Sequence, residues 1–82
     1  MHTVTHGCLV AVDNEMGRQD RKWGVQKHPD EYWLAIVLEE LGEVARAIVE
    51  KDQKSILFAE IQQCTAVMAQ WMECLDSIIE AQ

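Results

Sequence analysis

The acidic stretch around which this chain is organised is Glu39-Glu40-Leu41-Gly42-Glu43, with three carboxylates in five residues. Largely apolar runs flank it on both sides. Carboxylates that lie close together and are partly desolvated repel one another unless a cation lies between them. Hard divalent cations such as Mg²⁺ prefer oxygen ligands of this kind. An acidic motif in so apolar a setting therefore indicates a cation site, or else an exposed acidic edge of a helix.

The residues around this motif fit a helix with two neighbouring strips of side chains. At about 100° per residue, one strip is wholly apolar and is the predicted core face. Its members are Leu34, Val37, Leu38, Leu41, Ala45 and Ile48. The second strip consists of Trp33, Ile36, Glu40, Glu43 and Ala47. Glu39 points further round, toward Arg46 and Glu50. These glutamates are either a desolvated cluster or ordinary solvated surface residues, and the pattern leaves both interpretations open.

Length and composition predict a single all-α domain over residues 1–82. Hydrophobic residues make up 49% of the chain, with only one Pro and four Gly, which favours helices. Apolar periodicity predicts three main helices, over about residues 8–22, 29–51 and 55–80. A chain of this length buries only a modest core. We therefore expect a four-helix-bundle-type core that is completed by oligomerisation, as a homodimer or homotetramer.

Several residues mark the expected ends of these helices. Thr3 and Thr5 are candidate caps of the first helix, and Gly24 is its expected end. Pro29 is the expected first residue of the second helix, because proline suits that position. The polar connection over residues 51–55 is short enough to join two antiparallel helices.

Net charge and cysteine pattern exclude several classes of protein. A formal net charge of −7 at pH 7 argues against a nucleic acid polymer as partner, because phosphate binding needs clustered Lys and Arg. We expect a cytoplasmic protein with neither export signal nor membrane span, since no long apolar stretch occurs and no basic segment precedes an apolar one near residue 1. Cys8, Cys64 and Cys74 lack CxxC spacing, which argues against a disulfide framework or a zinc knuckle.

A further acidic residue, Glu60, lies at the edge of the apolar stripe of the third helix. That stripe consists of Leu57, Ile61, Cys64, Met68, Trp71 and Leu75. Burying an unpaired carboxylate is costly, so such a residue is normally ion-paired, protonated or bound to a metal. The predicted third helix contains no Lys or Arg that could pair with it. A metal shared by Glu40, Glu43 and Glu60 is therefore favoured, with Arg46 or an arginine near the N-terminus as the competing partner.

Residues upstream of the motif offer the elements of a ligand pocket. Gln19 interrupts the apolar stripe of the first helix, and its amide can read a polar ring edge or simply lie at the edge of the surface. Trp23 and Trp33 bracket the next connection and are either core anchors or the walls of a pocket for a flat ligand. No glycine-rich phosphate loop is visible, so phosphate would be held by metal and by isolated basic side chains. Those side chains are Arg18, Arg21, Lys22 and Lys27.

The acidic residues resemble the signature of the MazG-like all-α nucleoside triphosphate pyrophosphohydrolases, which is E-E-x-x-E followed by E-x-x-D. Residues 39–43 match the first half, and Glu60-Ile61-Gln62-Gln63 fits the second half with Gln63 in place of the aspartate. The resemblance continues upstream, from the Arg-Gln-Asp-Arg-Lys-Trp-Gly segment at residues 18–24 to the His-Pro pair that follows it, as in small phage-type and mobile-element members. It covers about residues 9–76.

The resemblance implies an activity. Members of this family cleave nucleoside triphosphates between the α and β phosphates, and they release a nucleoside monophosphate and pyrophosphate. Glutamates hold the Mg²⁺ that the reaction needs, with Mn²⁺ as a possible substitute. Such an enzyme could remove unwanted nucleotides from the cellular pool.

The resemblance also implies roles for individual residues. Glu40, Glu43 and Glu60 would be metal ligands, and Gln63 would add a neutral and weaker oxygen ligand. Glu39 would be a further ligand or the group that activates water, so the catalytic residues would be Glu39 and Glu40. The candidate substrate-binding residues are Gln19, Lys22, Trp23, Lys27, His28 and Trp33.

A second interpretation keeps the fold and changes the function. Gln63 removes one charged ligand from the motif, so the chain could be a catalytically weakened helical module that binds nucleotides or a protein partner. Magnesium dependence of nucleotide hydrolysis separates the two interpretations.

Overall fold

The computed structural model describes residues 3–82, and it consists of three α-helices. They are α1 (His6–Trp23), α2 (Asp30–Val49) and α3 (Lys54–Ala81). No strand occurs within residues 3–82, which confirms the predicted all-α class with three helices. Each predicted helix limit lies within two residues of the observed one. None of these helices is long and apolar enough to cross a membrane.

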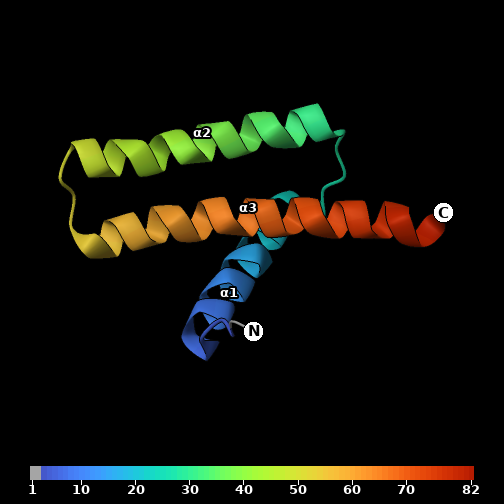
Figure 1. Cartoon of the computed structure of the whole chain (residues 1–82), viewed down its shortest axis with the longest axis horizontal. Coiled ribbons are helices and arrows are strands. Elements are labelled where there is room, and N and C mark those ends of the chain that lie inside the picture. Colours follow the sequence, from blue (N-terminus) through green and yellow to red (C-terminus); the bar gives the residue numbers. More distant parts are fainter. Residues whose placement is uncertain (1–2) are drawn as a thin grey trace.

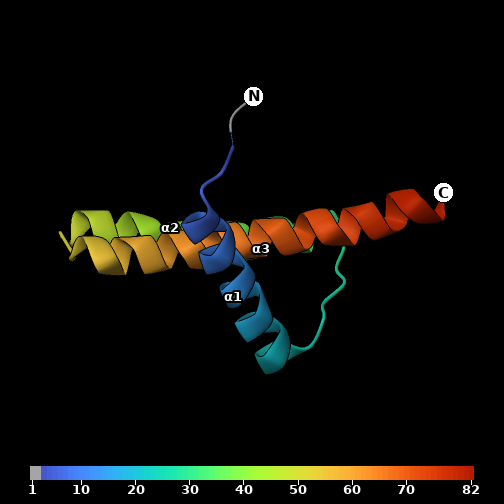
Figure 2. The same ribbon diagram turned by 90° about the horizontal axis from the view of Figure 1, so that it is seen from below.

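The helices are arranged as a hairpin with one helix across it. Figure 1 shows α2 and α3 running antiparallel and side by side along the long axis of the molecule. Figure 2 shows α1 crossing α3 at a steep angle. Both α1 and α2 pack on α3, and in the described part of the chain they do not pack on each other. α3 is therefore the central helix, and a space remains between α1 and α2.

The ends of α1 follow from its capping residues. The hydroxyl of Thr5 accepts a hydrogen bond from the amide of Cys8 at 3.4 Å, which provides the predicted N-cap. Gly24 ends the helix with a φ of 76°, in the left-handed region, and its amide donates to the carbonyl of Asp20 at 2.8 Å. A side chain at Gly24 would strain this turn and would change how the chain leaves α1.

Pro29 was predicted to be the first residue of α2, and this is wrong: it lies just before the helix, which begins at Asp30. Its extended backbone, with φ −66° and ψ 156°, is typical of an N-cap, and its carbonyl accepts from the amides of Tyr32 and Trp33. Asp30 and Glu31 then occupy the first turn, where negative charge is favourable next to the positive end of the helix dipole.

A tight reversal joins α2 to α3. Lys51 adopts the left-handed conformation with φ 56°, and the amide of Asp52 donates to the carbonyl of Ala47 at 2.9 Å. This bond satisfies a carbonyl at the end of α2 and turns the chain back on itself. The short polar connection thus joins antiparallel helices, as the sequence predicts.

The core is small and lies between α2 and α3. Trp33 and Val37 of α2 pack against Val67 and Cys74 of α3, and Trp33 is only 2% exposed. Partly buried residues beside them are Ile36, Cys64 and Trp71. This cluster fixes the spacing of the two helices, and the indole nitrogen of Trp71 adds a bond of 2.9 Å to Asp30 near their open end.

The predicted core face of α2 is largely wrong. Of that stripe, Val37 is buried, whereas Leu34, Leu38, Leu41 and Ile48 are 48–60% exposed. The second strip faces α3 instead: Trp33 and Ala47 are buried and Glu40 is partly buried. The two strips are neighbours on the helix surface. The strip that contains the large indole of Trp33 is the one that packs against α3.

The stripe predicted for α3 is also only partly buried. Cys64 and Trp71 lie against the core, while Ile61, Met68 and Leu75 remain exposed. The reason is that α3 has two partners on adjacent sides, so its packed face is centred between them rather than on the most apolar line.

Apolar residues thus remain exposed on the side of the hairpin that faces away from α1, here called the outer face. On each helix they recur at intervals of three, four or seven residues and so share one side. The outer face consists of Leu34, Leu38, Leu41 and Ile48 of α2 with Met68, Met72, Leu75 and Ile79 of α3.

Candidate active site

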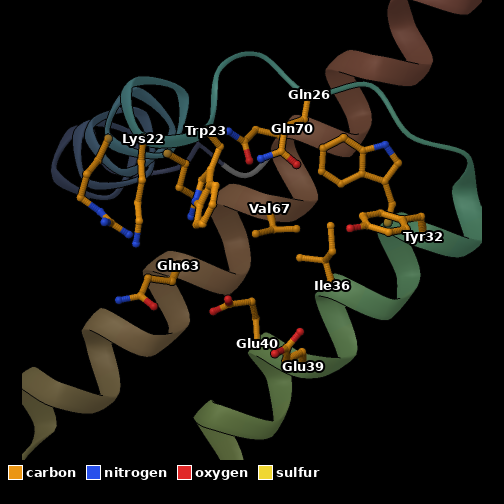
Figure 3. A pocket seen from close by; sticks show the side chains of 13 residues that line it. Lys22, Trp23, Gln26, Tyr32, Ile36, Glu39, Glu40, Gln63, Val67 and Gln70 are labelled. Carbon is orange, nitrogen blue, oxygen red and sulfur yellow. The ribbon is translucent and has the colours of Figure 1, made fainter.

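A cleft of about 480 Å³ lies between α1 and α2, with α3 as its floor. Figure 3 shows the side chains that surround it. They are Arg18, Gln19, Lys22 and Trp23 of α1, Gln26 of the linker, Tyr32, Trp33, Ile36, Glu39 and Glu40 of α2, and Gln63, Val67 and Gln70 of α3. This volume lies in the range of ordinary ligand pockets, and the lining mixes aromatic, apolar and charged groups.

Seven of the site residues proposed from the sequence line this cleft together. They are Gln19, Lys22, Trp23, Trp33, Glu39, Glu40 and Gln63. Three helices contribute to this set, and up to 44 residues separate its members along the chain. The crossing of α1 over α3 brings the Gln19 segment opposite the acidic motif of α2.

Two further acidic candidates lie outside the lining. Oε2 of Glu43 lies 3.6 Å from a guanidinium nitrogen of Arg46, which is one turn further along α2. Both side chains are substantially exposed. The ion pair that competes with metal binding at Glu43 is therefore present. Glu60 is partly buried on α3 and lies near enough to Glu40 to influence its pKa.

Lys27 and His28 are not cleft residues either. Lys27 lines a neighbouring hollow, beside Glu73 and Ser77, that shares Gln26 and Gln70 with the cleft. The ring of His28 lies 4.3 Å from the ring of Tyr32 and 5.0 Å from that of Trp33, and its Nε2 is 2.6 Å from Oε1 of Gln26. His28 therefore supports the cleft wall from behind rather than facing a ligand.

The carboxyl group of Glu40 carries the clearest electrostatic signature of the cleft. Partial burial raises its pKa, and the negative charges of Glu60, Glu39 and Glu43 raise it further, in that order. Burial also raises the pKa of the Cys64 thiol, and the charge of Glu40 adds to that shift. Several carboxylates thus act on one partly desolvated acid, and no ion-pair partner of Glu40 occurs among the described residues.

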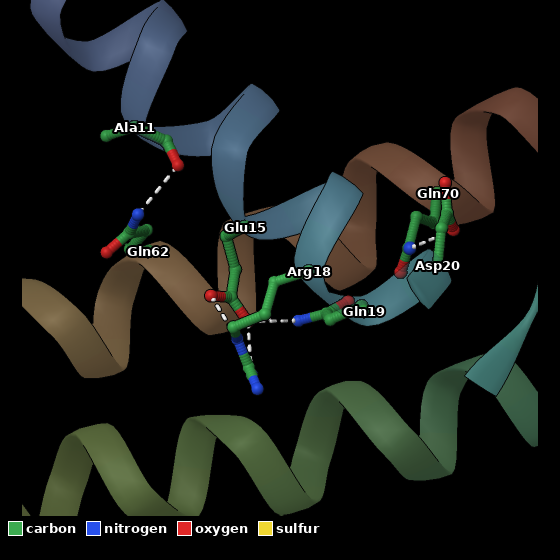
Figure 4. A network of polar contacts seen from close by, with 7 residues as sticks. All are labelled: Ala11, Glu15, Arg18, Gln19, Asp20, Gln62 and Gln70. Atoms are coloured by element: carbon green, nitrogen blue, oxygen red, sulfur yellow. Dashed lines mark hydrogen bonds and ion pairs between the residues drawn. The ribbon is translucent and has the colours of Figure 1, made fainter. Parts of the chain in front are cut away.

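A buried carboxylate that the sequence did not predict lies behind the α1 wall. Glu15 is 6% exposed, and it accepts two bonds from Arg18, at 2.9 and 2.6 Å, and one from Gln19 at 2.9 Å. Figure 4 shows this network. The Arg18 hydrogen bond, the largest cause, lowers the pKa of Glu15 in spite of its burial. The signal available in the sequence was the spacing of three and four residues, which places all three side chains on one helix face.

The two tryptophans play different parts. Trp33 is a core anchor that also forms part of the wall, and its indole N–H finds no acceptor within residues 3–82. Trp23 is 64% exposed at the rim, where the ammonium of Lys22 lies 4.9 Å from its ring centroid. Trp23 is thus available to stack on a flat ligand.

Some lining residues were not singled out from the sequence. Gln26, Tyr32 and Gln70 carry polar groups, and Ile36 and Val67 are apolar. No local motif marks them. The amide of Gln70 donates to Asp20 at 3.1 Å, and Gln62 donates to the backbone of Ala11 at 2.7 Å, so these α3 glutamines also hold α1 in place.

The chemistry of the acidic residues suits a hard divalent cation, whereas their present spacing does not form a finished site. Carboxylate oxygens are the preferred ligands of Mg²⁺, and Glu40 is a partly buried acid without a cationic partner. Within residues 3–82, however, no three His, Cys, Asp or Glu side chains are grouped closely enough to hold a metal ion. Glu43 would first have to leave Arg46.

The chain was compared with models of known protein families, with curated proteins and with solved structures, and none of the three comparisons found a match. The chemistry of the cleft is therefore the basis for assigning a function.

Proposed function

We propose that this protein is a metal-dependent nucleoside triphosphate pyrophosphohydrolase of the MazG-like type. The observation that carries the proposal is Glu40, whose pKa is raised by burial and by neighbouring carboxylates and which lacks a cationic partner in the described structure. Such an arrangement costs free energy that a bound cation would recover. The motif resemblance names the same residue.

The distribution of side chains in the cleft fits a nucleotide. Figure 3 shows Glu39, Glu40 and Gln63 toward one end and Trp23 and Tyr32 toward the other. A base can stack at the aromatic end, while the phosphates extend toward the acidic end with a metal between the two sets of anions. An anionic substrate without a metal would be repelled by that end.

The metal proposal assigns Glu40, Glu43 and Glu60 as carboxylate ligands of Mg²⁺ or Mn²⁺, with the amide oxygen of Gln63 as a neutral ligand. A bound metal would polarise the phosphate oxygens and lower the pKa of a coordinated water. Glu39 lines the cleft and is exposed, and in this proposal it would accept the proton that the attacking water loses. Attack at the α-phosphorus then breaks its bond to the bridging oxygen, and pyrophosphate leaves.

The basic residues of α1 bind and orient the phosphates. Arg18 and Lys22 both line the cleft and carry the positive charge that the acidic end lacks. Arg18 is held by Glu15 and is half exposed, so its outer guanidinium edge remains available to a phosphate oxygen. The products would be a nucleoside monophosphate and pyrophosphate, which suits removal of unwanted nucleotides from the pool.

The proposal includes assembly through the outer face. Residues of this face are 36–71% exposed. At roughly 180 Å² for each large apolar residue, they present on the order of 800 Å², the area that each partner of a standard interface buries. Pairing α2 and α3 of one copy with those of a second would form a four-helix bundle, and two such dimers would form a tetramer.

A panel of nucleoside triphosphates tests the activity. Pyrophosphate release should occur with Mg²⁺ and stop with EDTA. Mg²⁺ should also stabilise the nucleotide-free protein, by about 2.7 kcal/mol at a hundredfold excess over its dissociation constant. If Mg²⁺ produces no pyrophosphate release and no stabilisation at any concentration, the proposal is ruled out.

A non-catalytic nucleotide-binding module is the second candidate. It is favoured by Gln63, which lacks the charge of the aspartate in the motif, and by the absence of three converging ligands within residues 3–82. Nucleotide binding without pyrophosphate release, at all Mg²⁺ concentrations, would support this candidate over the first.

A further inference from the structure

Four glutamine amides line the cleft, and three of them are held by partners that do not line it: Gln19, Gln26 and Gln70. The fourth, Gln63, lies toward the acidic end. An amide presents an acceptor oxygen on one side and a donor nitrogen on the other, so the partner that binds one end decides which end faces the ligand. The orientation of these three groups therefore sets part of the hydrogen-bonding pattern of the cleft, beside the indole N–H of Trp33.

Glu15 fixes the amide of Gln19. The amide nitrogen donates to Oε2 of Glu15 at 2.9 Å, and a carboxylate can only accept, so the reverse orientation is excluded. Arg18 holds the carboxylate itself through two bonds. Figure 4 shows that the oxygen of Gln19 is turned away from Glu15. This oxygen is left to accept a hydrogen bond from a ligand.

Asp20 fixes Gln70 in the same sense, whereas His28, in the tautomer that carries its proton on Nε2, holds Gln26 in the opposite sense. The amide nitrogen of Gln70 donates to Oδ1 of Asp20 at 3.1 Å, which leaves its oxygen free to accept. Oε1 of Gln26 lies 2.6 Å from Nε2 of His28, which leaves the Gln26 amide nitrogen free to donate.

We propose that the cleft selects guanine among the common bases, and this inference rests on the proposal that its ligand is a nucleotide. Two fixed acceptors and one fixed donor match a ring edge with two donors and one acceptor. Guanine presents N1–H and N2–H beside O6. The oxygens of Gln19 and Gln70 accept from the two N–H groups, and the Gln26 amide donates to O6.

The other bases match this pattern less well. Adenine and cytosine direct ring-nitrogen acceptors toward oxygens that also only accept. Uracil and thymine offer a single donor between two acceptors. A site whose polar groups are held in place rejects ligands that leave those groups unpaired, and such discrimination exceeds what apolar contacts provide. Glu15 and Asp20 are thus positioning residues for base selection.

Titration of tryptophan fluorescence with nucleoside monophosphates tests the inference without requiring hydrolysis. Trp23 and Trp33 both line the cleft and report binding. GMP should bind at least roughly tenfold more tightly than AMP, CMP or UMP. IMP differs from GMP only in lacking the 2-amino group, and it should also bind roughly tenfold more weakly than GMP. Equal affinity for GMP and IMP would overturn the inference.

Two variants separate amide orientation from a general structural role. Glu15→Gln and Asp20→Asn each replace an obligate acceptor with an amide that can accept or donate, which frees the neighbouring glutamine to reverse. Both variants should weaken GMP binding. The variant that frees the acceptor of N2–H should bring the GMP to IMP affinity ratio toward one and leave IMP affinity nearly unchanged, whereas the variant that frees the acceptor of N1–H, which IMP retains, should weaken GMP and IMP alike. The control Asp13→Asn, at an exposed site on α1 outside the cleft, should keep the wild-type ratio. An equal loss of both affinities in Glu15→Gln and Asp20→Asn would overturn the inference.

The outcome is separable from that of the proposed hydrolysis. Guanine preference without pyrophosphate release from GTP would remove the hydrolase proposal and leave the base selection. Magnesium-dependent release with equal affinities for the monophosphates would support the hydrolase proposal and remove the base selection. If Glu15→Gln fails to fold by circular dichroism, the GMP to IMP ratio of the wild-type protein decides the test, and Asp20→Asn should still weaken GMP binding relative to Asp13→Asn.

Discussion

The two sides of the α2–α3 hairpin differ in chemistry although the same two helices form them. The side toward α1 borders the cleft and presents Glu39, Glu40, Gln63 and Gln70. The outer face presents leucine, isoleucine and methionine side chains that are about half exposed. A buried core line that includes Trp33 and Val67 separates the two sides.

This difference indicates what each side is for. A soluble monomer rarely exposes a large contiguous apolar patch, which is why we propose that a second copy covers the outer face. Charged and amide groups gathered in a concave site are best explained by a polar ligand. Cleft variants should therefore change activity, whereas outer-face variants should change assembly.

The largest effect is expected at the acidic end of the cleft. Glu40→Gln should reduce pyrophosphate release at least roughly 100-fold, as loss of a single charge stabiliser does in other enzymes. The metal-free protein should be as stable as wild type or more so, because one repelling carboxylate is removed. Glu31→Gln, in the exposed first turn of α2, is the matched control. A large loss of metal-free stability would instead assign Glu40 a structural role.

Charge on the outer face should have the next largest effect. Wild-type protein at micromolar concentration should sediment as two or four chains. The double variant Leu38→Glu, Met72→Glu should sediment as one 9.4 kDa chain, because burying two carboxylates against apolar side chains costs several kcal/mol. Val25→Glu, at an exposed linker valine, should leave the mass unchanged. A wild-type mass of 9.4 kDa would refute assembly through this face.

Replacing the buried carboxylate of α1 should have a smaller, pH-dependent effect. The Arg18 hydrogen bond keeps the pKa of Glu15 below its ordinary value of 4.5, so the ionised form stabilises the fold. This contribution is fully present above pH 4.5 and is lost as the pH falls through the lower pKa of the folded state. Glu15→Gln should cost about 1–3 kcal/mol of unfolding free energy at pH 7.

Urea denaturation at pH 7 and at pH 3 measures this contribution. The difference between wild type and Glu15→Gln should shrink at the lower pH, while Asp13→Asn should match wild type at both. An equal penalty at both pH values would mean that Glu15 acts through packing rather than charge.

The smallest effect is expected at Gln63. Gln63→Asp adds a carboxylate to the end of the cleft that holds Glu39 and Glu40. The Mg²⁺ concentration at half-maximal activity should fall several-fold, because a charged ligand binds Mg²⁺ more tightly than an amide. The metal-free protein should lose roughly 1 kcal/mol from added repulsion. An unchanged Mg²⁺ titration would remove Gln63 from the metal site.

The sequence by itself determined the helices and their ends. Capping by Thr5 and the left-handed turn at Gly24 depend on a few neighbouring residues, so local reasoning found them. Helix type and length follow from periodicity within single segments for the same reason. The acidic motif, too, was visible as a local departure from an apolar pattern.

Only the tertiary structure decided which sides of these helices meet. A helical wheel gives the angle between side chains but not the partner that each side faces, so the Leu34 stripe was assigned to the core although the Trp33 strip occupies it. Gln19 and Glu40 line the same cleft because α1 crosses α3, and no local pattern encodes that crossing angle. Glu15 was missed because its burial comes from helix packing, whereas its own helix face shows only an ordinary acid beside an arginine.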